Sequence, residues 1–243
     1  MDGLELAARF SAAPNALGLC GPKGFQMSAK RQLAAQLKRF LAPYTYLSLI
    51  AGANGLEPFD TEVVEAFWLG NKLLDAVKRE DMANAIMKKF TGPGRLKPER
   101  AQALAEALPA RVYPHHSFHV FYIGSISGVL RGTAAEMDRC RVGWGEVKKV
   151  NGKQMQVGYR PIQKKTKKEK ENKKSAPLAF GPEKNVSWKL WSDLPAPSSG
   201  SLVCSHWGQA IIPISRRRMA NLEKYTRLNM ELYSRPPVRN FHG

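Results

Sequence analysis

Cys140 is the residue with the clearest capacity for chemistry, because it stands between Arg139 and Arg141 at the start of a β-prone stretch. A thiolate binds soft and borderline metals, and neighbouring guanidinium groups favour the anion, so the sequence predicts a lowered thiol pKa here. The alternative is that Cys140 is a small buried hydrophobic residue at the start of a strand. Cys140 is therefore a candidate metal ligand.

A second candidate is the histidine cluster His115, His116 and His119. Spacings of three and four residues allow His116 or His115 to pair with His119 on one metal ion, with a further ligand from Cys20 or an acidic residue. The other interpretation is that these are hydrogen-bonded core histidines, since no Cys-x-x-Cys or His-Glu-x-x-His pattern accompanies them, and that Cys20 is a buried structural cysteine. A metal-dependent enzyme built on this cluster is one open hypothesis.

The elements that would position Cys140 are short β-strands. Asn151-Gly152 joins two β-prone runs and predicts a hairpin with a type I′ turn. Further strand-like pieces cover Pro177 to Gly181, Val186 to Trp191 and Ser201 to Gly208, and a helix is expected from Ser215 or Arg216 to Tyr233. These pieces predict a small, closed β-barrel with a C-terminal helix.

The chain before Cys140 shows helical spacing of apolar residues and helix-capping residues. The segment Pro114 to Gly124 is ambiguous between a buried strand and a core helix. The fold class is thus α+β: a helical bundle at residues 1–138, the barrel and its helix at 139–235, and a mobile tail at 236–243. The expected helices span Leu4 to Phe10, Ser28 to Leu41, Tyr44 to Ala53, Thr61 to Lys78, Met82 to Phe90, Glu99 to Leu108 and Thr133 to Asp138.

The net charge of +18 is uneven. Residues 1–139 carry 17 Lys and Arg against 13 Asp and Glu, whereas residues 140–243 carry 21 against 7. A lysine-rich stretch at about 163–175 has almost no apolar residue, which predicts a solvated, disordered insertion.

A strongly basic protein attracts nucleic acid or acidic partners, so the alternative to a metal-binding protein is a nucleic-acid-binding protein. Its candidate contacts are Lys164, Lys165, Lys167 and Lys168, with Trp188, Trp191 and Trp207 as a stacking platform.

The composition also limits where the protein acts. No run of 18 apolar residues is present, so we expect no membrane span. The first residues, Met-Asp-Gly-Leu-Glu-Leu, lack the features of a signal peptide. Three scattered cysteines make no disulfide framework and suit a reducing cytoplasm.

The C-terminal part resembles the HypC/HupF family of nickel–iron hydrogenase maturation chaperones. The likeness rests on Cys140, on Gly145 and Val147 shortly after it, and on Ser201-Leu-Val-Cys-Ser-His206-Trp-Gly-Gln-Ala-Ile before a helix. The family pattern has a near-N-terminal Cys, a Pro-Gly-x-Val turn, and Gly-Asp-x-Val-x-Val-His-x-Gly-x-Ala. This chain departs from it: Trp144 replaces the proline, Ser201 replaces the aspartate, and the cysteine lies in mid-chain.

The resemblance implies that the barrel is of the OB type. It also implies a non-catalytic accessory protein that holds an iron fragment, or another metal such as zinc, through Cys140 and His206. It also implies a protein partner, either a maturation scaffold or a metalloenzyme precursor. The candidate partner-binding residues are Cys140, Arg141, Trp144 and Trp207. The sequence identifies neither the metal nor the partner.

The whole chain also resembles an uncharacterised prokaryotic family. The shared features are the starting motif Leu17-x-x-Cys-Gly-Pro22, the segment Asn54-Gly-x-x-Pro-Phe-Asp60 and the block Pro114-His-His-Ser-Phe-His119. This second resemblance implies no activity.

Overall fold

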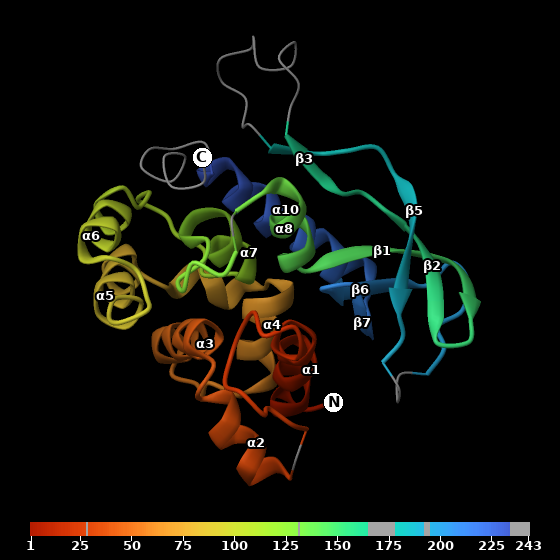
Figure 1. Ribbon diagram of the computed structural model, residues 1–243, viewed down its shortest axis with the longest axis horizontal. Coiled ribbons are helices and arrows are strands. Elements are labelled where there is room, and N and C mark those ends of the chain that lie inside the picture. The colour runs from red at the N-terminus through yellow and green to blue at the C-terminus, as the bar shows by residue number, and fades with distance from the viewer. Residues whose placement is uncertain (28, 131, 165–177, 192–194, 234–243) are drawn as a thin grey trace.

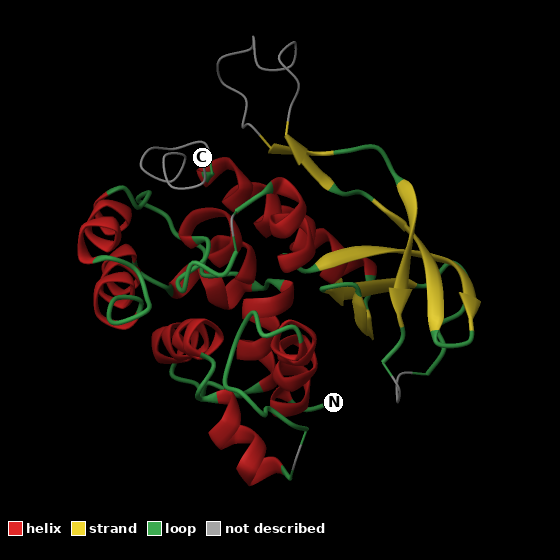
Figure 2. Cartoon of the chain, viewed as in Figure 1, coloured by secondary structure: helices red, strands yellow, loops and turns green. Residues whose placement is uncertain are grey.

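The computed structural model describes residues 1–27, 29–130, 132–164, 178–191 and 195–233. Helices and strands occupy separate sides of the molecule, with the N-terminal helices on one side and the strands on the other (Figures 1 and 2). The last helix, α10 (Arg216–Leu232), returns to the helical side, where it packs on α4 and α7. The predicted α+β class, with a barrel and a C-terminal helix, is confirmed.

The helical part begins with six α-helices, close to where the apolar spacing predicts them. Gly55 ends α3 in the left-handed conformation (φ 66°), and Pro98 occupies the first turn of α6, as expected. Pro14 does not end the first helix, which continues to Ala16. The helices are α1 (Gly3–Ala16), α2 (Lys30–Leu37), α3 (Leu41–Asn54), α4 (Thr61–Leu69), α5 (Arg79–Lys89) and α6 (Pro98–Glu106).

The helix expected from Thr61 to Lys78 is shorter than predicted. It ends at Leu69, and a separate 3-10 helix, η1 (Lys72–Ala76), follows. Gly70 has φ 84°, and a Cβ on it would lie 2.3 Å from the ring of Tyr225. The turn therefore requires glycine, because the positive φ is unfavourable for other residues and a side chain here would meet Tyr225 of α10.

The ambiguous segment Pro114 to Gly124 is helical. It contains one turn of α-helix, α7 (His116–Phe118), followed by a π-helical turn, η2 (His119–Ile123). Most of its side chains are buried, and such wide turns are frequent at functional sites.

The barrel follows α8 (Ala134–Cys140), whose N-terminus carries a capping box between Thr133 and Glu136. Five strands close it in the order β1-β2-β5-β7-β6. Of the five pairs of neighbouring strands in this barrel, β5 and β7 are parallel and the other four pairs are antiparallel. The barrel strands are β1 (Gly143–Asn151), β2 (Gln154–Tyr159), β5 (Lys184–Lys189), β6 (Leu202–His206) and β7 (Gln209–Pro213), and a separate two-stranded sheet holds β3 (Ile162–Lys164) and β4 (Leu178–Phe180).

The predicted hairpin forms between β1 and β2, but its turn differs from the expectation. Asn151 pairs with Gln154, so the first turn consists of Gly152 and Lys153, and only Gly152 has a positive φ. The predicted type I′ turn at Asn151-Gly152 is therefore wrong in register and type. Positive φ at both turn residues occurs instead between β6 and β7, at Trp207 (φ 53°) and Gly208 (φ 74°).

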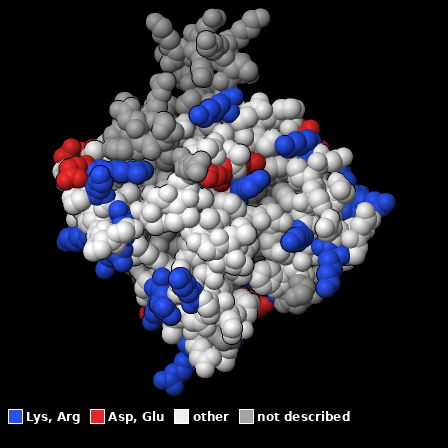
Figure 3. Space-filling model, viewed as in Figure 1, with Lys and Arg blue, Asp and Glu red and all other residues white. Residues whose placement is uncertain are grey.

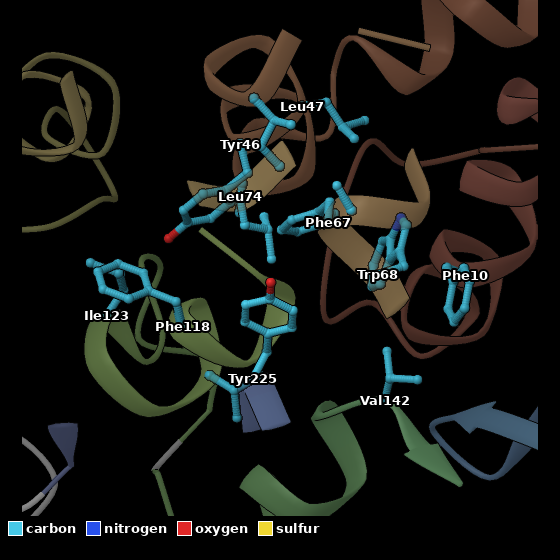
Figure 4. Packing of buried hydrophobic residues seen from close by; sticks show 14 of the residues in the cluster. Phe10, Tyr46, Leu47, Phe67, Trp68, Leu74, Phe118, Ile123, Val142 and Tyr225 are labelled. Atoms are coloured by element: carbon cyan, nitrogen blue, oxygen red, sulfur yellow. The ribbon is translucent and has the colours of Figure 1, made fainter. Parts of the chain in front are cut away.

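The main hydrophobic cluster extends from the helices into one side of the barrel. Phe10 of α1 stacks on Trp68 of α4 with ring centroids 4.7 Å apart, and Phe67 lies against the same indole (Figure 4). The cluster also includes Cys204 and Ile211 from the barrel. The division at residues 138 and 139 remains a prediction, because the two parts share this buried contact.

A second, smaller cluster fills the barrel itself, and Trp188 belongs to it with only 5% of its surface exposed. Trp188 therefore cannot serve as the predicted stacking platform for bases. Among the described residues, no helix is both long and apolar enough to cross a membrane. Lys164 is exposed at the end of β3, whereas Lys165, Lys167, Lys168, most of the lysine-rich insertion and the tail 236–243 lie outside the described residues.

Candidate metal centre

Three side chains that are distant in sequence converge where the helices meet the barrel. His116 comes from α7, Cys140 from the last position of α8, and His206 from the end of β6. One potential ligand atom of each lies within 4.8 Å of the others. Cys140 and His206 are thus brought together as the sequence led us to expect, but the site lies at the junction of the two parts rather than on the barrel alone.

His206 has a fixed orientation that suits a ligand. Its Nδ1 lies 2.6 Å from the carbonyl oxygen of Phe10, so Nδ1 carries the proton and donates it. Its Nε2 is buried and has no hydrogen-bond partner among the described residues. Burial lowers the pKa of His206 to about 4, an effect that the carbonyls of Phe10 and Cys140 oppose. The Nε2 lone pair is therefore free to bind a metal, in the arrangement that metal-ligating histidines usually show.

His116 faces His206 from the helical side. The two rings are nearly perpendicular (85°), with centroids 5.0 Å apart, and Trp68 covers the His116 ring at 4.5 Å. The His116 side chain is buried, and its Nδ1 has no partner among the described residues. Burial holds the pKa of His116 well below its usual value, with a further lowering from the nearby His206. Both imidazoles are consequently neutral, which is the form that binds metals.

Cys140 supplies the sulfur and is half-buried. Burial raises the pKa of its thiol to about 12, Cys20 raises it further, and a hydrogen bond from the Trp207 side chain opposes the rise. The expectation that Arg139 and Arg141 lower this pKa is wrong for the metal-free thiol. A coordinated metal ion would reverse the balance, because it deprotonates a thiol ligand outright.

Arg141 is engaged in the fold instead. Its guanidinium forms an ion pair with Asp138 and donates to the Tyr159 hydroxyl (2.7 Å) and to the Arg160 carbonyl (2.9 Å). Its side chain is 1% exposed. Arg141 therefore anchors α8 to the barrel and is not available to a protein partner, contrary to the role implied by the resemblance. Trp144, half-buried against Phe180, and Trp207, half-buried in the β6–β7 turn, retain some exposed surface.

The three neighbouring histidines do not form one site. His115 Nδ1 lies 2.7 Å from the Ser117 hydroxyl, and burial lowers its pKa to about 3. His119 Nδ1 lies 3.3 Å from the Tyr46 hydroxyl, and burial lowers its pKa to about 4. Neither His115 nor His119 joins the group of three ligand atoms that lie within 4.8 Å, so the pairing of His119 with His115 or His116 on one ion stays a prediction. His116 alone joins the centre, with Cys140 and His206, and nothing in the local spacing indicates that combination.

A cavity of about 500 Å³ opens beside the centre. Its walls include all three candidate ligands together with Cys20, His119 and Trp207. Burial raises the pKa of the Cys20 thiol to about 11. Cys20 faces the same cavity but does not belong to the group whose ligand atoms lie within 4.8 Å.

The chain belongs to the family described as "Family of unknown function (DUF6390)", which it matches over residues 1–239. This agrees with the resemblance to an uncharacterised family. No curated protein matches the chain. No solved structure matches it either.

Proposed function

We propose that this protein is a metal-binding accessory protein, of the kind that serves the maturation of a metallocentre such as that of a nickel–iron hydrogenase. The observation that carries the proposal is the convergence of His116, Cys140 and His206 within 4.8 Å. Burial of two neutral imidazoles with unpartnered nitrogens costs free energy unless those atoms are used. A metal ion would use them.

The donor set fits iron or zinc. One thiolate and two imidazoles form a mixed soft and borderline set, which suits these metals better than the oxygen-binding Mg²⁺ and Ca²⁺. His206 Nε2 is already oriented by the Phe10 carbonyl. The thiol of Cys140 would give up its proton on binding, and the hydrogen bond from Trp207 supports the resulting negative charge.

The likeness to HypC/HupF proteins is part of the proposal. Three features support it: a cysteine shortly before β1, a histidine at the end of β6, and a long helix after β7. The order of the five barrel strands and the parallel pairing of β5 with β7 support an OB-type barrel. In this chain, however, the helical part packs over the cysteine and the histidine and adds His116 to them.

The remaining parts of the proposal concern the partner and the place of action. We expect no reaction to be catalysed, and we expect a protein partner, either a maturation scaffold or a metalloenzyme precursor, that exchanges metal with the centre. The free thiols of Cys20, Cys140 and Cys204 suit a reducing compartment such as the cytoplasm.

Metal analysis tests the proposal directly. Protein purified without chelator should contain close to one equivalent of iron or zinc per chain, and Cys140→Ala and His206→Ala should lose it. Cys204→Ala is the matched control, because Cys204 is fully buried in the barrel wall with its thiol directed to the Ile212 carbonyl (3.6 Å). Equal metal content in Cys140→Ala and wild-type protein would overturn the proposal.

The nucleic-acid alternative has less support. Trp188 lies inside the barrel, and the basic side chains on the face drawn in Figure 3 are spread over helices and barrel alike rather than gathered in one patch. Its remaining basis is the net charge of +18.

A further inference from the structure

The candidate metal centre has three protein ligands, and a tetrahedral ion needs a fourth. Structural zinc sites are closed by four protein ligands, whereas sites that act on other molecules keep one position for an external ligand. Cys20, which is the nearest cysteine along the cavity wall, does not join the group of atoms within 4.8 Å. The His, Cys, Asp and Glu side chains of the described residues therefore leave one coordination position without a protein ligand.

That position is adjacent to a space that can hold a small molecule. The cavity of about 500 Å³ contacts His116, Cys140 and His206, and its size is typical of small-ligand sites. Loops form much of its wall, among them the segments 18–22, 93–95 and 124–130. A ligand in this cavity would reach the metal directly.

The charged and polar groups of the wall favour an anion. Among the described residues, the charged side chains of the wall are the exposed Arg39 and Arg95 and the half-buried Glu136. The Arg95 guanidinium also donates to the Lys89 carbonyl (3.2 Å), and the Glu136 carboxylate is bound by Thr133 in the capping box of α8. A guanidinium presents donors in a planar fork that matches the two oxygens of a carboxylate.

We propose that the open position of the metal takes a small carboxylate anion, which enters through this cavity and is held by Arg39 and Arg95. The inference rests on the proposed metal site and adds a ligand to it. The metal centre would then bind a metal ion together with an anion, and would not be only a structural metal site that holds the helices against the barrel.

Cobalt spectroscopy tests the inference with the whole protein. Co²⁺ is bound anaerobically, its visible absorption is recorded, and acetate is titrated against its neutral isostere acetamide. Acetate should shift the cobalt bands saturably, whereas acetamide should not. Arg39→Gln and Arg95→Gln should each weaken acetate binding by about fivefold, since each removes one nearby charge, without changing cobalt affinity.

Cys20→Ala separates the two ways in which the fourth position can be filled. In our proposal this variant keeps the thiolate-to-cobalt absorption of the wild type and still binds acetate. Loss of about half of that absorption would overturn the inference and assign the fourth position to Cys20. Wild-type cobalt bands that do not respond to acetate would overturn the inference as well. Failure of the wild type to bind cobalt at all would overturn the proposed metal site itself.

Discussion

The Nδ1 atom of His206 lies 2.6 Å from the carbonyl oxygen of Phe10, in a contact that spans 196 positions of the chain. It joins the end of β6 to the first helix and fixes which imidazole nitrogen faces the cluster. The centre can therefore form only when the helical part is packed on the barrel. Metal binding and the association of the two parts should depend on each other.

His206→Ala should lower the free energy of unfolding by about 2–4 kcal/mol even in the presence of chelator, because it removes a buried hydrogen bond and leaves a cavity beside Phe10 and Trp68. Urea unfolding followed by circular dichroism measures the change. Lys184→Ala, at an exposed position of β5, should change the stability by less than about 0.5 kcal/mol. A His206→Ala protein as stable as that control would show that the contact with Phe10 contributes nothing.

Acid should destabilise the metal-free protein over a defined pH range. The pKa values of His119 and His206 are lowered to about 4 and that of His115 to about 3, all by burial, whereas an unfolded histidine titrates near 6.5. The unfolded state thus binds more protons than the folded state below pH 6.5, so stability is complete above that pH and falls toward pH 4. Each such histidine contributes a slope of up to about 1.4 kcal/mol per pH unit.

Urea unfolding in chelator at a series of pH values measures this slope. His115→Gln should make it shallower, because it removes one buried neutral imidazole that lies outside the metal group. A free energy of unfolding that stays constant between pH 6.5 and 4.5 would contradict the lowered pKa values.

The helices were largely predictable because local signals define them. Gly55 and Pro98 mark helix ends by their own backbone preferences, whatever they pack against. The break after Leu69 also has a local signal, because Gly70 adopts the positive φ (84°) that glycine favours after a helix, but the apolar spacing continues past it and favours a longer helix. The contact of Gly70 with Tyr225, 155 residues further along the chain, has no local signal.

Gly70→Ala tests that contact. The new Cβ would lie 2.3 Å from the Tyr225 ring on a residue with φ 84°, so strain and overpacking together should cost about 2–4 kcal/mol. Gly52→Ala is the matched control: Gly52 lies inside α3 with open space around its Cβ position, and the change should stabilise the protein by about 0.5–1 kcal/mol. Thermal unfolding measures both variants, and the melting temperature of Gly70→Ala should be lower than that of Gly52→Ala. Equal melting temperatures would contradict this explanation of the turn.

The candidate centre was predictable only in part. Cys140 and His206 were expected to lie together because of the proposed likeness of the C-terminal part to HypC/HupF proteins, and their proximity needs only the barrel. His116 belongs to a run of three histidines whose spacing favours pairing among themselves. Its actual neighbours are set by the packing of α7 against Trp68 and His206, which no local pattern encodes.

Trp207 provides the most specific test of how the sulfur is held. It is the one described non-glycine residue with a positive φ, and such a conformation is costly for a bulky side chain. The turn is tied to α8 by a hydrogen bond from the Trp207 backbone N–H to the Arg139 carbonyl (3.1 Å), and the indole donates to Cys140.

Trp207→Phe keeps a ring but removes that donor, so cobalt affinity should fall by about tenfold, the usual loss for a hydrogen bond to a charged group. Trp191→Phe, which removes an indole near Arg9 and away from the cavity, should leave cobalt affinity unchanged. Equal cobalt affinities for the two variants, measured by competition with a chelator, would mean that the strained turn serves the fold and not the thiolate.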